Sequence, residues 1–87
     1  MFDVSEIRAD FPILAREVNG KPLVYLDNGA SSQKPEVVID AITRAYKDEY
    51  ANVHRGLHYL SNLATEKYES VRGIVARFLS ASDENEI

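Results

Sequence analysis

The residues best suited to chemistry lie in the stretch NVHRGLH, which holds both histidines of this 87-residue chain. Histidine is the usual general acid or base near neutral pH and a frequent metal ligand, and arginine binds carboxylates and phosphates through a planar fork. A zinc site needs three or four converging ligands, whereas His54 and His58 supply two and lack the HExxH pattern. Hydrolytic catalysis needs a nucleophile beside a base and an orienting acid, and no spacing here selects one. The stretch alone indicates loop histidines without a special role, and leaves metal or acid–base chemistry as the open alternative.

A second candidate is the loop NGASSQK at residues 28–34, which precedes a helix that begins at Pro35. Glycine, asparagine and serine let a backbone turn sharply, and the first amides of a helix can bind an anion. The loop contains neither GxxxxGK[ST] nor GxGxxG, so a flexible entry into the helix is an equal alternative. Its composition permits backbone N–H groups to come close to an anionic ligand such as a substrate carboxylate.

Three helices position these two segments. Asp3 or Ser5 can cap a short first helix, which Pro12 ends because the residue before a proline is forced out of the α region. Apolar residues spaced three and four apart predict two longer helices, at residues 35–49 and about 60–79. The apolar stripe of the last helix is typical of a core face, and we expect it to be exposed in this chain for want of a partner.

A small hairpin is predicted within residues 13–27, where the segments ILAREV and KPLVYLD flank Asn19-Gly20. That dipeptide is the one best suited to the two positive φ angles of a type I′ turn. Pro22 restricts the second strand to an edge position because proline donates no hydrogen bond. The fold class expected for the chain is therefore mostly α with a short β-hairpin.

Two features of the C-terminal half are unusual. Gly73 lies inside the predicted helix at 60–79, where glycine costs about 1 kcal/mol relative to alanine, so it indicates either a close packing contact or a tolerated defect. The polar turn before Glu86-Ile87 is typical of the entrance to a strand.

The composition narrows the class of protein. Fourteen acidic residues against ten basic ones give a net charge of −4, which argues against nucleic acid or an anionic membrane as the main partner. The absence of cysteine excludes a disulfide framework and a thiol nucleophile within this sequence. No apolar run is long enough for a membrane span, and the start has no signal-peptide pattern, so the expected location is cytoplasmic.

Three segments in this order resemble a known family: RADFPIL, EVNGKPLVYLDNGASSQKP and NVHRGLHYLSNLATEKYESVR. They are similar to the N-terminal end of the class V aminotransferase-like enzymes that use pyridoxal phosphate, in particular the SUF-type cysteine desulfurases and the related selenocysteine lyases. The resemblance implies a fragment of a larger two-domain enzyme of α/β architecture, the pyridoxal-phosphate-dependent transferase fold type I. Residues 1–27 would contribute to the small domain and residues 28–87 would begin the large domain.

The implied reaction converts L-cysteine to L-alanine and an enzyme-bound persulfide for iron–sulfur cluster assembly. The enzyme would be a cytoplasmic homodimer that passes sulfur to an acceptor protein of a SUF-type system. The family's catalytic lysine and cysteine and its cofactor contacts would lie beyond Ile87. The resemblance therefore implies an inactive fragment with no catalytic residue, no bound pyridoxal phosphate and no metal. The alternatives are a selenocysteine lyase or other class V enzyme, and a self-standing helical binding or assembly module.

The resemblance also implies which residues would line the active site of the intact enzyme. The small-residue loop would approach substrate and cofactor, and here it carries glycine where many relatives have alanine, which should make the loop more mobile. The HRG segment would lie near the active-site entrance and the subunit interface, with a role in positioning substrate or ordering a lid rather than in proton transfer, and His58 would be structural. The implied lining residues are Asn28, Gly29, Ala30, Ser31, His54 and Arg55.

Overall fold

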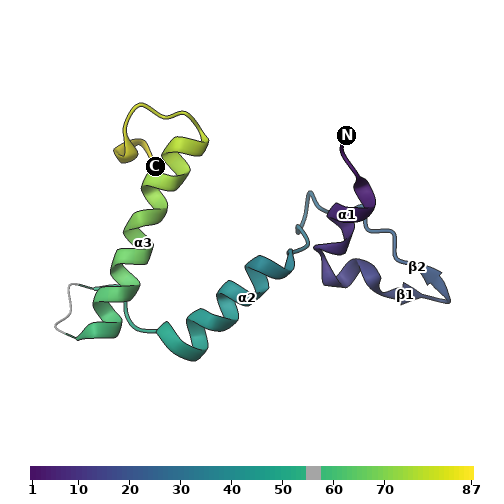
Figure 1. Ribbon diagram of the computed structural model, residues 1–87, viewed down its shortest axis with the longest axis horizontal. Helices are drawn as coiled ribbons and strands as arrows, with labels where there is room; N and C mark the ends of the chain where they lie inside the picture. Colours follow the sequence, from purple (N-terminus) through teal and green to yellow (C-terminus); the bar gives the residue numbers. More distant parts are fainter. Residues whose placement is uncertain (55–57) are drawn as a thin grey trace. The chain divides into compact units, whose positions relative to one another are not determined.

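The computed structural model describes residues 1–54 and 58–87 (Figure 1). The chain divides into two units, Met1–Thr43 and Arg44–Ile87. The described residues are mostly helical and contain one antiparallel hairpin, which confirms the predicted fold class. None of the helices in these two ranges is long and apolar enough to cross a membrane.

The first unit begins with helix α1 (Val4–Ala9). Asp3 is its N-cap, because an Asp3 carboxylate oxygen accepts a hydrogen bond from the Ser5 amide at 2.8 Å. The helix ends before Pro12, as predicted. Pro12 then opens a 3₁₀ turn, Pro12–Ala15, in which its fixed φ suits the first position.

The hairpin consists of β1 (Glu17–Val18) and β2 (Lys21–Pro22), joined by Asn19 and Gly20. Both turn residues have positive φ, 54° and 75°, as a type I′ turn requires. The prediction of a small hairpin and its turn is confirmed, and the strands are shorter than the segments ILAREV and KPLVYLD that flank the turn. Each strand has two residues. The 3₁₀ turn includes the first residues of the segment ILAREV. Among the described residues no third strand pairs with the segment KPLVYLD beyond Pro22.

Pro22 is tolerated in β2 because of the hairpin register. It faces Glu17 in the pair next to Val18 and Lys21, where the ladder of a two-residue hairpin places no N–H···O bond. The next bond runs from the Leu23 amide to the Arg16 carbonyl at 3.1 Å. The proline therefore removes no donor that the hairpin uses.

The predicted helix at residues 35–49 is confirmed as α2 (Glu36–Arg44), which continues as a π-helical turn, Ala45–Glu49. The Glu36 amide donates to the Asp10 carbonyl at 2.8 Å. This bond satisfies one of the free amides at the start of α2 and ties that start to the end of α1.

The second unit is built on α3 (Tyr59–Phe78), which confirms the helix predicted at about 60–79. Its N-cap is His58, whose ring Nδ1 accepts a hydrogen bond from the Ser61 amide at 3.2 Å. The expected structural role of His58 is thereby explained: it satisfies one of the amides that a helix start leaves free.

The end of α3 is closed by a Schellman motif. Ser80 takes the left-handed conformation, with φ of 56°, and its amide donates to the Arg77 carbonyl at 3.2 Å. The Ala81 amide donates to the Ala76 carbonyl at 2.8 Å. Glycine usually occupies the left-handed position, so Ser80 carries a backbone cost here.

The chain then folds back as a 3₁₀ turn, Glu84–Glu86, instead of the predicted entrance to a strand. Asp83 caps this turn by accepting from the Asn85 amide at 2.8 Å. Local bonds of this kind satisfy a backbone that has no neighbouring strand among the described residues. The turn comes so near to α3 that a Cβ added at Gly73 would lie 3.3 Å from the Glu84 carboxylate. This contact is with the end of a flexible side chain, so both interpretations of Gly73, a close packing contact and a tolerated defect, stay open.

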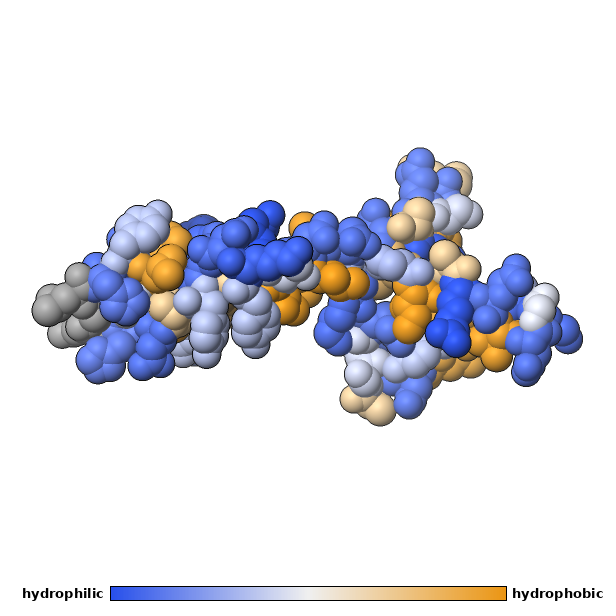
Figure 2. Space-filling model, turned by 90° about the horizontal axis from the view of Figure 1, so that it is seen from below, coloured by the Kyte–Doolittle hydropathy of each residue, from blue (hydrophilic) through white to orange (hydrophobic). Residues whose placement is uncertain are grey.

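Hardly any side chain is buried. Among the described residues only Ala76, 6% exposed, and Ser61, 1% exposed, are buried. Hydrophobic residues, orange in Figure 2, reach the surface. On α3 Ile74 is 54% exposed and Phe78 86% exposed, which confirms the predicted exposed apolar face of this helix.

Candidate functional site

The loop at residues 28–31 in the first unit is held by a phenol. The Tyr25 hydroxyl donates to the Ser31 carbonyl at 2.5 Å and also lies 3.3 Å from the Asp27 carbonyl. The same Asp27 carbonyl accepts from the Ala30 and Ser31 amides at 3.0 and 3.1 Å. Tyr25 thus bridges the two ends of a single tight turn. Residues 23–27 form no strand, so a side chain and not a strand end holds this loop.

Asn28 braces the far side of the loop. Its side-chain oxygen accepts from the Gln33 amide at 3.3 Å, and its carbonyl accepts from the Ser32 hydroxyl at 3.4 Å. Gly29 is exposed, and a Cβ added there would meet no described atom within 4 Å. The fold of this unit therefore does not itself require glycine at that position.

Asn28 also lines a hollow of about 220 Å³ in the first unit. The Arg8 guanidinium borders this hollow and donates weakly to the Leu23 carbonyl at 3.5 Å. A guanidinium beside amide groups and an aromatic ring is suited to a small anion with an apolar part. The lining residues are Arg8, Phe11, Leu14, Tyr25, Asn28 and Gln33.

In the second unit two hydroxyl groups of α3 hold the backbone at His54. The Ser61 hydroxyl lies 2.9 Å from the Asn52 carbonyl and 3.0 Å from the His54 carbonyl. The Thr65 hydroxyl lies 3.1 Å from the His54 carbonyl and 2.8 Å from the Ser61 carbonyl. His54 itself is exposed, so its ring projects from an anchored backbone.

Sequence reasoning missed Ser61 and Thr65, although their spacing of four placed two hydroxyls on one face at the start of the predicted helix. Arg55, the other candidate of the HRG segment, lies outside the described residues. The lining residues predicted at 28–31 and the predicted His54 belong to different units, and each group is described only within its own unit. Their roles in substrate binding stay predictions.

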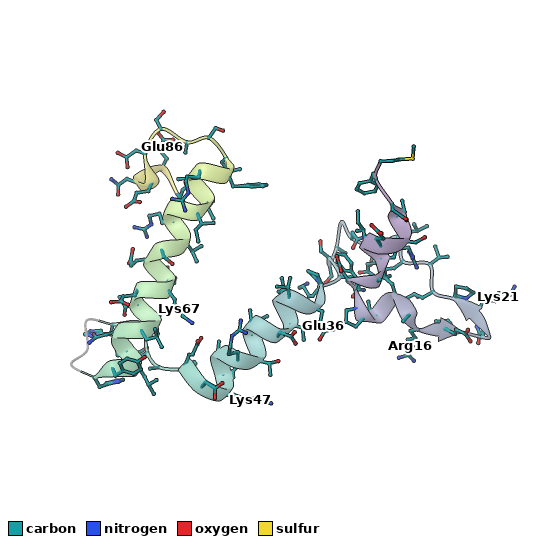
Figure 3. The ribbon with its side chains drawn as sticks, in the orientation of Figure 1. Arg16, Lys21, Glu36, Lys47, Lys67 and Glu86 are labelled. Atoms are coloured by element: carbon teal, nitrogen blue, oxygen red, sulfur yellow. The ribbon has the colours of Figure 1, made fainter. Side chains whose placement is uncertain are left out.

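An ion pair ties the end of the π-helical turn to α3. Lys67 projects from α3 (Figure 3), and its Nζ lies 2.5 Å from Glu49 Oε1. Both side chains also border a hollow of about 250 Å³, together with Ala64 of α3 and with Tyr50 and Val53 from the segment that leads to His54. Ion pairs near the surface contribute under about 1 kcal/mol to the free energy of unfolding. This pair therefore fixes where the chain leaves the π-helical turn more than it stabilises the unit.

The four lysines of the chain all lie at the surface of the described residues. The lysine that binds this cofactor as a Schiff base is activated by desolvation or by a neighbouring cation, and Lys21, Lys34, Lys47 and Lys67 are all exposed. Lys21 and Lys47 project away from the backbone (Figure 3). In the same part of the chain no three His, Asp or Glu side chains gather as a metal ion would require.

Comparison with known proteins gives consistent matches. Residues 24–87 match the model of the family described as Aminotransferase class-V. The chain is 55% identical over 86 residues to proteins named cysteine desulfurase from Yersinia pestis (strain Pestoides F) and from Yersinia pseudotuberculosis serotype O:1b (strain IP 31758). Each alignment covers 99% of this chain, which spans 21% of the length of these relatives.

Proposed function

The chain belongs to the aminotransferase class-V family, and from this premise we propose that it forms the N-terminal part of a cysteine desulfurase. The single observation that carries the proposal is 55% identity across 99% of the chain with proteins of that name. The family is generally dependent on pyridoxal phosphate, which would supply an electron sink when bound. The groups that bind the cofactor and react would come from sequence other than this chain.

The proposed reaction transfers sulfur from L-cysteine to an enzyme thiol. The C–S bond of cysteine breaks, an S–S bond forms on the enzyme, and the former β-carbon takes up a proton to give L-alanine. Atoms balance, because one cysteine and one thiol become one alanine and one persulfide. This chain has no cysteine, so the thiol is not one of its residues.

The part of this chain in the reaction would be to orient the substrate. The small loop at residues 28–31, held by Tyr25, exposes backbone and small side chains that a substrate can approach closely. His54 projects from a backbone that α3 anchors. Both features suit positioning, which lowers a barrier by fixing reacting groups in a productive geometry.

Several further properties belong to the same proposal. The intact enzyme would be a cytoplasmic homodimer that passes its sulfur to an acceptor of a SUF-type system for iron–sulfur cluster assembly. Residues 1–27 would belong to its small domain and residues 28–87 to its large domain. The exposed apolar faces of α2 and α3 support a larger assembly, because isolated faces of this kind are unfavourable in water.

The test uses the full-length gene product, purified with pyridoxal phosphate. We expect it to form alanine from L-cysteine in the presence of a thiol reductant, and we expect the 87-residue chain with added cofactor to form none. Selenocysteine in place of cysteine tests the lyase alternative, which would show turnover of selenocysteine and negligible turnover of cysteine. A full-length product that forms no alanine from cysteine would refute the proposal.

A further inference from the structure

We propose that Ser61, assisted by Thr65, is a positioning residue that sets where His54 lies. The inference rests on the proposed function, in which His54 lies at the substrate entrance. It concerns two residues of α3 to which the sequence assigned no role. Neither is proposed to touch the substrate, because each acts on the His54 backbone.

Burial is the first argument. Ser61 is 1% exposed in a chain whose other described residues, apart from Ala76, are at least partly open to solvent. A buried hydroxyl without a partner is costly, so its bonds determine whether the site is stable. The carbonyls of Asn52 and His54 lie within 3.0 Å of the Ser61 hydroxyl. Its single proton can be donated to one of them at a time, which makes both carbonyls part of one small network.

The direction of these bonds is the second argument. Serine and threonine inside helices commonly bond to a carbonyl of their own preceding turn. Ser70 does so, donating to the Lys67 carbonyl at 2.8 Å. Ser61 instead reaches carbonyls seven and nine residues earlier, outside the helix. Its hydroxyl therefore joins the start of α3 to the segment that ends at His54.

Thr65 gives the network a second attachment. Its hydroxyl lies 3.1 Å from the His54 carbonyl, one helical turn beyond Ser61. The same hydroxyl lies 2.8 Å from the Ser61 carbonyl, so its single proton alternates between the two and Thr65 assists Ser61 as the weaker attachment. The imidazole stays exposed while the backbone that carries it is fixed.

The experiment compares Ser61→Ala with Ser70→Ala in the full-length enzyme. Removing one net hydrogen bond should raise KM for L-cysteine about three- to tenfold in Ser61→Ala, with kcat within about twofold of the parent. Ser70→Ala removes a hydroxyl from the same helix and should leave KM unchanged. Thr65→Val should raise KM in the same direction and Thr65→Ser should restore it. The two Thr65 variants test the proposal independently if Ser61→Ala folds poorly.

A double-mutant cycle separates positioning from general stability. In a His54→Ala background, Ser61→Ala should change KM no further, because its effect passes through His54. An effect that adds fully in that background would overturn the proposal. Equal KM values for Ser61→Ala and Ser70→Ala would overturn it as well.

A second readout does not depend on turnover. Carbonyl-¹³C histidine combined with ¹⁵N arginine gives one signal for each His-Arg pair of the full-length enzyme, and this chain contributes one such pair. The signal that disappears in His54→Ala is the His54 carbonyl. Ser61→Ala should shift that signal and Ser70→Ala should not. If the parent enzyme forms no alanine from cysteine, the proposed function fails, and this signal alone decides the positioning role: an unshifted signal refutes it.

Discussion

At the scale of single residues, the Tyr25 hydroxyl connects the two ends of the candidate substrate loop at residues 28–31. Its hydroxyl meets the Ser31 carbonyl at the end of the loop, while the Asp27 carbonyl at the start accepts two loop amides. A bond of this kind contributes about 0.5–1.5 kcal/mol net. That is enough to decide whether a short exposed loop keeps one shape, because such loops are otherwise among the least stable parts of a protein.

Tyr25→Phe should loosen this loop without removing the aromatic ring. In the full-length protein we expect the amides of Ala30 and Ser31 to exchange with solvent deuterium about three- to tenfold faster. The control is Tyr46→Phe, since the Tyr46 hydroxyl bonds to no described residue. Unchanged exchange in Tyr25→Phe would show that the loop is held by other contacts.

At the scale of elements, the end of α3 combines two features that oppose helix stability. Ser80 occupies a left-handed position that favours glycine, and Gly73 occupies a helical position that favours alanine. The two positions differ in what surrounds them. Ser80 closes a Schellman motif, whereas Gly73 lies near the Glu84 side chain of the returning turn.

Ser80→Gly should stabilise the end of α3 by about 0.5–1 kcal/mol, because the backbone cost of a side chain at positive φ disappears. The Ala81 amide, which bonds to the Ala76 carbonyl, should then exchange about two- to fivefold more slowly. Ser82→Gly is the matched control, since Ser82 has no positive φ and should gain nothing. A slower exchange in both variants would contradict the assignment of the cost to Ser80.

Gly73→Ala should raise the helicity of α3, measured by circular dichroism. The reason is that alanine favours the helix over glycine by up to about 1 kcal/mol. The new Cβ would lie 3.3 Å from the end of the flexible Glu84 side chain, which is exposed and can move aside. In a Glu84→Ala background the gain should be larger. A loss of helicity in both backgrounds would mean that Gly73 is required for another contact.

At the scale of the whole molecule, the two units have secondary structure but almost no core. A chain of this size normally buries about 60% of the surface that its unfolded form exposes. Here the described residues bury one apolar side chain, Ala76. Secondary structure in a folded protein depends mainly on burial of such faces, so these helices need a partner for stability. The family match is consistent with this need, because the chain spans 21% of its relatives.

The 87-residue chain by itself should associate in a concentration-dependent manner in sedimentation experiments, because its apolar faces are uncovered. The double variant Ile74→Lys with Phe78→Lys should lower the associated fraction, since both residues are exposed on α3. Asn62→Lys with Ser70→Lys adds the same charge at exposed polar positions and controls for repulsion. A monomer with a cooperative melt would favour the self-standing binding or assembly module instead.

The sequence by itself determined the local elements of this protein. The helices at 35–49 and 60–79 follow from apolar spacing, and the hairpin follows from Asn19-Gly20, because local sterics and periodicity act over a few residues. The same patterns did not determine the lengths of the strands, and they indicated a strand entrance at Glu86 where a 3₁₀ turn lies. Strand length depends on a neighbouring strand, which a local pattern does not contain.

Only the tertiary structure decided which side chains hold the candidate segments. Ser61 and Tyr25 are ordinary residues in the sequence, yet their hydroxyls bond to carbonyls brought near by the fold. The nearness of the Glu84 side chain to Gly73 is likewise visible only in the structure. The physical reason is that a hydrogen bond or a close contact depends on atoms a few ångströms apart in space, whatever their separation along the chain.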